Sequence, residues 1–132
     1  MEYKELTGQI IGAAIEVHRR LGPGYLESAY EEALCIELEH RHISYERQKQ
    51  LPVYYRGKLI GEHRLDLVVE ELIIVELKAI SAIENIHFAV LRSYLKAAKL
   101  DHCLLLNFAS IAPTVKRVGR EQSARIVPYL HL

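Results

Sequence analysis

The stretch RLDLVVEELIIVELK, residues 64–78, decides the fold of this chain. It joins two runs dominated by Leu, Ile and Val, residues 59–69 and 72–77, which are separated only by Glu70-Glu71. Runs of this length and composition predict β-strands, and so short a separation predicts an antiparallel hairpin that is buried on both faces. Charged side chains inside such strands are rare unless they are paired or bind a metal, so Asp66, Glu76 and Lys78 require an explanation.

Toward the N-terminus, residues 51–55 are rich in strand formers, and Arg56-Gly57-Lys58 supplies a hairpin turn into the next run, which predicts a meander of three strands. Apolar residues at steps of three or four predict an amphipathic helix over residues 6–21. A glycine-proline-glycine segment ends it, and a second helix is expected over residues 26–40.

Toward the C-terminus, helical spacing returns over residues 83–99, and residues 102–108 form another apolar run typical of a strand. Pro113 and Gly119 frame a last short segment. The order of two helices, three strands, a helix and a strand predicts an α/β fold in which helices flank a mixed β-sheet. With 132 residues, half of them apolar, we expect one domain spanning residues 1–132.

The charges of the chain balance, with 17 basic and 17 acidic residues, which argues against a strong uniform positive field for holding nucleic acid. They are nevertheless segregated. Residues 24–42 hold five glutamates, whereas residues 111–132 are basic through Lys116, Arg117, Arg120 and Arg125. The basic segment could contact phosphates, although a charge run generally forms a solvated face.

Cys35 and Cys103 lie in apolar surroundings, which predicts two buried free thiols rather than a disulfide or a thiolate zinc site. The histidines show no ligand spacing for zinc, since His40 and His42 are only two residues apart. No apolar run is long enough for a membrane span, and the N-terminus lacks the layout of a signal peptide, so we expect a cytoplasmic protein.

Asp66, Glu76 and Lys78 together resemble the components of a metal-dependent hydrolytic site. Glu76 and Lys78 are two residues apart and share one face of their strand. A carboxylate pair on adjacent strands could hold Mg²⁺, or Mn²⁺, and the lysine could orient water or stabilise charge on a phosphoryl oxygen. A structural ion pair is the alternative, but two carboxylates for one lysine would leave charge unmatched.

This hypothesis depends on the register of the two strands. If residues 70–71 formed a two-residue turn, Asp66 would lie on the face opposite Glu76. A three-residue turn or a bulge brings both carboxylates onto one face. We therefore predict that odd register, with Asp66 opposite Glu76 or diagonally across from it.

These residues and their order resemble the PD-(D/E)XK nucleases, and the string Gly24-Tyr25-Leu26-Glu27-Ser28-Ala29-Tyr30 is similar to the signature of the GxxExxY branch. The resemblance runs from about Glu5 to Val118 and includes residues 11–18 and 45–48. It implies metal-dependent cleavage of nucleic acid, for which we expect DNA. It also implies that Glu27 joins Asp66 and Glu76 as a metal ligand, with Tyr30 on the same helical face.

One position departs from that family pattern. Related nucleases often carry a glutamine four residues before a tyrosine in the helix after ExK, and here Val90 stands before Tyr94. The resemblance implies a substrate-positioning role for that glutamine, which His87, one turn earlier, could partly take over. Its loss leaves a second reading open, in which the protein keeps the nuclease fold but only binds nucleic acid or a protein partner.

Two further expectations concern surfaces. The tyrosines could stack on bases, but at helix and strand positions we expect them to pack at the edge of the core with the hydroxyl outward; they are Tyr25, Tyr30, Tyr45, Tyr54 and Tyr55. A domain of this size has little room to embrace a duplex, which favours a homodimer.

Overall fold

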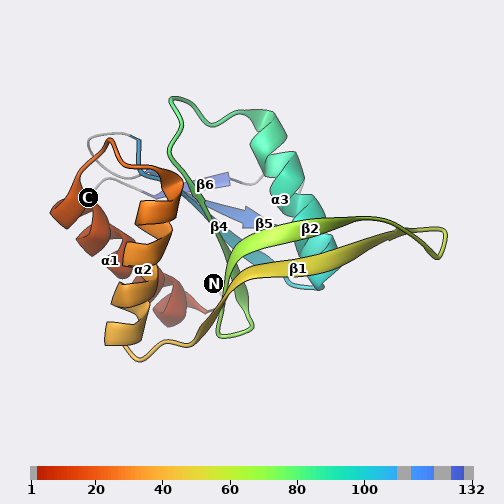
Figure 1. Ribbon diagram of the computed structural model, residues 1–132, viewed down its shortest axis with the longest axis horizontal. Coiled ribbons are helices and arrows are strands. Elements are labelled where there is room, and N and C mark those ends of the chain that lie inside the picture. Colours follow the sequence, from red (N-terminus) through yellow and green to blue (C-terminus); the bar gives the residue numbers. More distant parts are fainter. Residues whose placement is uncertain (1–2, 110–113, 121–125, 130–132) are drawn as a thin grey trace.

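The computed structural model describes residues 3–109, 114–120 and 126–129. Its helices and strands follow the order α1 (Lys4–Leu21), α2 (Glu27–His40), β1 (Tyr45–Tyr55), β2 (Lys58–Val69), β3 (Ile73–Lys78), α3 (Asn85–Ala98), β4 (His102–Asn107), β5 (Thr114–Gly119) and β6 (Ile126–Tyr129). The strands form one six-stranded sheet in the order β1-β2-β3-β4-β5-β6. This is the α/β fold with a flanked mixed sheet that the sequence predicts (Figure 1).

The sheet is mixed because α3 connects two neighbouring strands. Strands β1, β2 and β3 form the expected antiparallel meander. Strand β4 pairs with β3 in parallel, and β5 and β6 then continue antiparallel. Three features differ from the prediction: β1 begins at Tyr45 rather than Leu51, the short segment before Gly119 is strand β5, and β6 was not foreseen.

Each face of the sheet carries its own apolar core. Helices α1 and α2 cover one face, where Val75 and Leu77 of β3 point, and α3 covers the other, where Ile74 points. Strand β3 is thus enclosed on both sides, as alternate side chains of a strand point to opposite faces. Glu76, with only 4% of its surface exposed, lies within this enclosed strand.

The prediction of burial on both faces is wrong for the outer half of β2. Residues 58–64 are exposed apart from the half-buried His63. They pair only with β1, since the β2–β3 ladder spans no more than Leu67 to Val69. Residues 50–64, here named the arm, therefore form a two-stranded ribbon that extends away from the helices (Figure 1).

The tyrosines divide into two groups. Tyr30 is fully buried and stacks on Phe108 with ring centroids 4.5 Å apart, and the Tyr45 hydroxyl donates to Glu39. Tyr54 and Tyr55 of the arm are 62% and 63% exposed, so the expectation that they pack at the edge of the core is wrong. At this point the sheet is only two strands wide, because β2 pairs with β3 no farther out than Leu67.

The basic segment near the C-terminus is not a solvated face in the part that is described. Arg117 is 6% exposed and its guanidinium lies 3.2 Å from His102 Nδ1. Arg120 pairs with Asp101 at 3.1 Å, and Lys116 is half-buried. Arg125 lies outside the described residues. Arg117 and Arg120 therefore contact other residues of the domain rather than forming a solvated face.

Cys35 and Cys103 are both free and buried, as expected. Burial raises the pKa of the Cys35 thiol to about 11. None of the helices in the described ranges is long and apolar enough to cross a bilayer.

Candidate metal centre

The turn between β2 and β3 produces the odd register. Glu70 and Glu71 both have positive φ, and Leu72 N–H donates to the Val69 carbonyl at 2.9 Å, as in a two-residue turn. The ladder nevertheless pairs Val69 with Ile73, so Leu72 is an extra residue in the connection. Because the side-chain period of a strand is two, this one residue decides which carboxylates share a face. The predicted register is confirmed.

Asp66 and Glu76 lie where β2 and β3 separate. The backbone ladder ends at the pair Leu67–Val75, and Asp66 and Glu76 are the next residues outward from the turn. Side chains continue it: Asp66 N–H donates to Glu76 Oε1 at 3.0 Å, and Leu77 N–H donates to Asp66 Oδ2 at 2.9 Å. The two carboxylates therefore occupy the fork between the strands, each held by the backbone of the other side.

Both acids resist ionisation in this fork. Burial raises the pKa of Glu76 to about 8, and the charge of Asp66 adds to the increase. Burial also raises the pKa of Asp66, partly offset by the hydrogen bond from Leu77. Two adjacent carboxylates in a low-dielectric site disfavour each other's charged form. A bound cation would stabilise the charged forms of both acids, so the arrangement suits a cation.

Lys78 ends β3 beside this fork. Its positive charge lowers the pKa of both Asp66 and Glu76, which places it within electrostatic reach of the pair. Yet among the described residues its ammonium forms no ion pair within 4.0 Å of a carboxylate. The alternative of a structural ion pair is therefore not supported. Immediately after it, the buried Asn107 fixes the chain by accepting from Ile80 N–H at 3.2 Å and donating to Ile80 O at 3.0 Å.

Glu27 approaches the same site from the start of α2. Its Oε2 accepts a hydrogen bond from Ala79 N–H at 3.3 Å, and its charge raises the pKa of both Asp66 and Glu76. The side chain is exposed. Within the described ranges, no three acidic, histidine or cysteine side chains already form a group that could hold a metal ion. The structure thus brings Glu27 near the pair without assembling the three into one ligand set.

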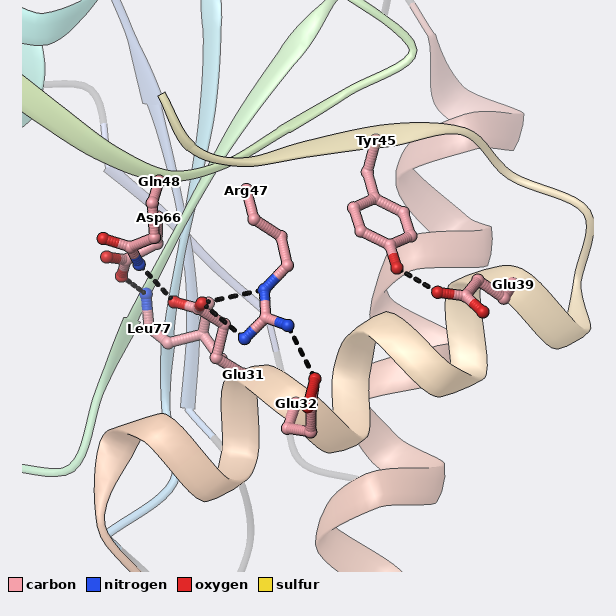
Figure 2. Close-up of polar contacts among 8 residues, drawn as sticks. All are labelled: Glu31, Glu32, Glu39, Tyr45, Arg47, Gln48, Asp66 and Leu77. Carbon is pink, nitrogen blue, oxygen red and sulfur yellow. Dashed lines mark hydrogen bonds and ion pairs between the residues drawn. The ribbon is translucent and has the colours of Figure 1, made fainter. Parts of the chain in front are cut away.

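Glu31, one turn after Glu27, is an acidic residue of this site that sequence reasoning missed. It is 7% exposed, and its charge contributes to the raised pKa of Asp66. Arg47 binds Glu31 Oε2 at 3.0 Å and Glu32 at 2.6 Å, and Gln48 Nε2 donates to Glu31 Oε1 at 2.8 Å. Figure 2 shows Arg47 reaching from β1 to both glutamates of α2. The spacing of four residues between two helical glutamates was the available signal.

Tyr94 lies on the α3 side of the fork. Burial raises the pKa of its hydroxyl, and the charges of Glu76 and Asp66 add to the increase. Its ring also contacts His63 of the arm, with centroids 4.7 Å apart. Of the three residues expected to support the site or position substrate, Tyr94 is the one whose pKa is raised by the charges of both carboxylates.

The other two supporting residues serve the backbone. His87 Nδ1 accepts Glu84 N–H at 2.8 Å in a capping box at the start of α3. Tyr30 donates to the Gly22 carbonyl at 2.6 Å and accepts from Tyr25 N–H at 3.2 Å, which braces the turn that leads to Glu27. Val90, at the expected glutamine position, is 39% exposed and brings no polar group.

The donor set fits a hard divalent cation. Asp66 and Glu76 each use one oxygen for a backbone amide, and within the described ranges Oδ1 of Asp66 and Oε2 of Glu76 accept no hydrogen bond. Carboxylate oxygens are the ligands that Mg²⁺ and Mn²⁺ prefer. Such a cation would offset both the burial and the neighbouring acidic charges that raise the two pKa values.

Comparisons with known proteins agree with this chemistry. No curated protein and no solved structure gave a match to the chain. A family model described as the PD-(D/E)XK nuclease superfamily matches residues 4–118, which include the whole fork, Glu27 and Lys78. Members of that superfamily are generally nucleases and typically use divalent metal ions. The chain belongs to the PD-(D/E)XK nuclease superfamily.

Proposed function

We propose that the protein is a Mg²⁺-dependent or Mn²⁺-dependent nuclease that hydrolyses phosphodiester bonds in DNA. The observation that carries the proposal is the pair Asp66 and Glu76, which share a buried fork although burial raises the pKa of both and the charge of Asp66 raises that of Glu76 further. A purely structural element would gain nothing from two carboxylates held side by side. Lys78, close but not ion-paired within the described residues, completes the set.

The residues of the fork have distinct roles in this proposal. Asp66 and Glu76 would hold the metal ion, since each keeps one carboxylate oxygen that accepts no hydrogen bond among the described residues. When bound, a divalent cation lowers the pKa of coordinated water and neutralises charge on a phosphoryl oxygen. Lys78 stabilises the negative charge that grows on the phosphate and helps orient the attacking water. Glu27 would complete the ligand set once its Oε2 no longer accepts the 3.3 Å hydrogen bond from Ala79 N–H.

We further assign the chain to the GxxExxY branch, because each position of that motif has a physical task here. Gly24 has a φ of +109°, a conformation that side-chain-bearing residues rarely adopt. Glu27 reaches the backbone that follows β3. The Tyr30 hydroxyl closes the loop between α1 and α2 through Gly22. The motif thus fixes the approach of Glu27 to the fork.

A second candidate function is recognition of nucleic acid without cleavage. Val90 favours it, because an exposed apolar side chain stands where the family resemblance implies a polar group for positioning substrate. His87 does not replace that group through Nδ1, which is used in the helix cap. A cleavage assay separates the two functions.

The test is cleavage of circular and linear DNA, single- and double-stranded, and of RNA, with Mg²⁺ or Mn²⁺. The parent is compared with Glu76→Ala and Lys78→Ala. Glu5→Ala and Lys4→Ala, which remove the same charges from the exposed start of α1, are matched controls. Thermal melting of each variant verifies that it is folded.

The proposal predicts that the parent and both controls cleave DNA and that neither site variant does. Equal activity in Glu76→Ala and the parent would overturn it. DNA binding without cleavage in any protein would favour the recognition function, and cleavage of RNA alone would correct the substrate.

A further inference from the structure

The arm, residues 50–64, exposes more large apolar surface than its position in the fold requires. Four neighbouring side chains at its tip are each more than 60% exposed, namely Tyr54, Tyr55, Leu59 and Ile60. Tyr54 and Leu59 are cross-strand partners, so they share one face. Ile60 has no cross-strand partner, because the register shifts between Val53 and Tyr54, and it lies next to the Tyr54–Leu59 pair. Clustered exposed apolar side chains of this kind mark interaction sites.

Positive charge surrounds this apolar tip. Arg56, Lys58 and Arg64 of the arm are exposed, and only Glu62 opposes them. In the part of the chain that the structure describes, none of the three cations makes a hydrogen bond or an ion pair. Arg56 occupies the two-residue turn with positive φ, which places its side chain at the extreme end of the ribbon. The arm is therefore a local basic patch in a chain of zero net charge.

The arm and Asp66 of the candidate metal centre are connected directly, because strand β2 runs through both. Seven positions separate Leu59 from Asp66 along this strand, and at about 3.3 Å per residue the tip lies roughly 23 Å from the fork. That distance is about six to seven base pairs of duplex, since each pair rises about 3.4 Å. The contact of His63 with Tyr94 of α3 supports the base of the ribbon.

From this combination we infer that the arm is the element that grips double-stranded DNA, six to seven base pairs from the phosphate that is cut. The inference rests on the proposed function for the position of the cleaved phosphate. Arg56 and Lys58 bind backbone phosphates, and the apolar side chains meet base edges. A two-stranded ribbon fits the major groove, where thymine methyl groups offer apolar contacts. Tyr54 and Tyr55 could stack on the bases of a single strand, whereas Leu59 and Ile60 lack an aromatic face; the fit of a two-stranded ribbon to the major groove is therefore what favours the duplex.

The test measures the affinity for a labelled duplex as a function of salt, in the Glu76→Gln background so that cleavage does not interfere. The slope of log K against log salt is negative, and each lost phosphate contact reduces its magnitude by about 0.9, so Arg56→Gln/Lys58→Gln should reduce the magnitude by about 1.8. Arg19→Gln/Arg20→Gln removes the same charge from the exposed end of α1, away from the arm (Figure 1), and should leave the slope unchanged.

The apolar contacts have their own signature. Tyr54→Ser and Leu59→Ser should weaken binding on the order of tenfold without changing the salt slope, because no charge is lost. Equal slopes for the arm variant and the α1 control would overturn the inference. Arm-dependent binding to a single-stranded oligonucleotide but not to the duplex would overturn it as well.

A second copy of the chain is the competing occupant of the apolar tip. Sedimentation velocity decides this: a dimeric parent that becomes monomeric on Leu59→Ser would show that the tip joins two copies, which overturns the inference. Failure of the proposed function is read separately from cleavage by the parent. A parent that cuts DNA while the arm variant keeps the parental slope refutes the arm alone, whereas arm-dependent binding without any cleavage refutes the nuclease alone.

Discussion

Asp66 donates its backbone N–H to Oε1 of Glu76 at 3.0 Å, and its own side chain accepts the amide of the residue after Glu76 at 2.9 Å. The two acids are thereby fixed beside each other at the point where their strands separate. The hydrogen bonds orient both carboxylates, while burial disfavours their charges. We therefore expect the metal-free protein to be less stable than it would be with neutral side chains at these two positions, a cost that fits the proposed cation site.

Asp66→Asn should raise the melting temperature while abolishing cleavage. The asparagine oxygen can still accept the Leu77 amide, and the charge that opposes Glu76 is gone. A gain of about 1 kcal/mol would raise the melting temperature by roughly 3–5 °C in a domain of this size. The measurement is calorimetry in chelator at about pH 9, where both acids of the parent carry charge. A lower melting temperature would show that the carboxylate is structural.

The metal-free protein should lose stability as pH rises from about 4.5 to about 8. The pKa of Glu76 is about 8 in the folded state against an ordinary value of 4.5, so the folded state keeps a proton that the unfolded state releases. The stabilisation from this retained proton is fully present below the unfolded pKa and is lost as pH rises through the folded pKa. The loss amounts to up to a few kcal/mol, at about 1.4 kcal/mol per pKa unit. Urea unfolding across this window should give a flatter profile for Glu76→Gln, and parallel profiles would contradict the assignment.

Binding of Mn²⁺ at neutral pH should release a proton from Glu76, because the ligand must be ionised and its pKa is about 8. The calorimetric enthalpy of binding should therefore depend on the ionisation enthalpy of the buffer. A metal concentration of 100 times Kd should stabilise the fold by about 2.7 kcal/mol. Both effects should vanish in Glu76→Ala, and an unchanged melting temperature in the parent would argue against a metal site.

Arg47→Met should destabilise the fold by about 2 kcal/mol, since among the described residues it leaves the buried carboxylate of Glu31 without a cation and with only the hydrogen bond from Gln48. The partial exposure of Arg47, 37%, keeps the loss below that of a fully buried pair. The matched control Arg19→Met breaks a surface pair with Glu16 and should cost less than about 0.5 kcal/mol. Adding Glu31→Gln to Arg47→Met should recover part of the loss, and denaturant unfolding measures all four proteins.

The same substitution at two glycines should have opposite signs. Gly24→Ala should destabilise by about 1 kcal/mol or more, because φ is +109° at that position. Gly8→Ala in α1 should stabilise by about 0.5–1 kcal/mol, because a Cβ there meets nothing within 4 Å and helices favour alanine. Thermal unfolding checks both, and a neutral Gly24→Ala would remove the physical reason for the first position of the motif.

The sequence predicted the elements whose residues determine their own local structure. Apolar spacing located the three helices, and the runs around Asp66 and Glu76 located the central strands. It did not reveal how far those strands are covered, since an apolar residue such as Leu59 has the same strand propensity whether or not a neighbouring layer exists. For the same reason the arm was expected to be buried.

By itself, the sequence determined the α/β fold, the family and the identity of the three charged residues in the central strands, because periodicity and residue type are local properties. Only the tertiary structure decided which acidic residue of α2 is buried beside Asp66 and which cations remain unpaired. Glu31 is held by Arg47 from β1, and Arg56 and Lys58 are left free of partners among the described residues. Such pairings depend on distances between segments far apart in the chain, which no local pattern encodes.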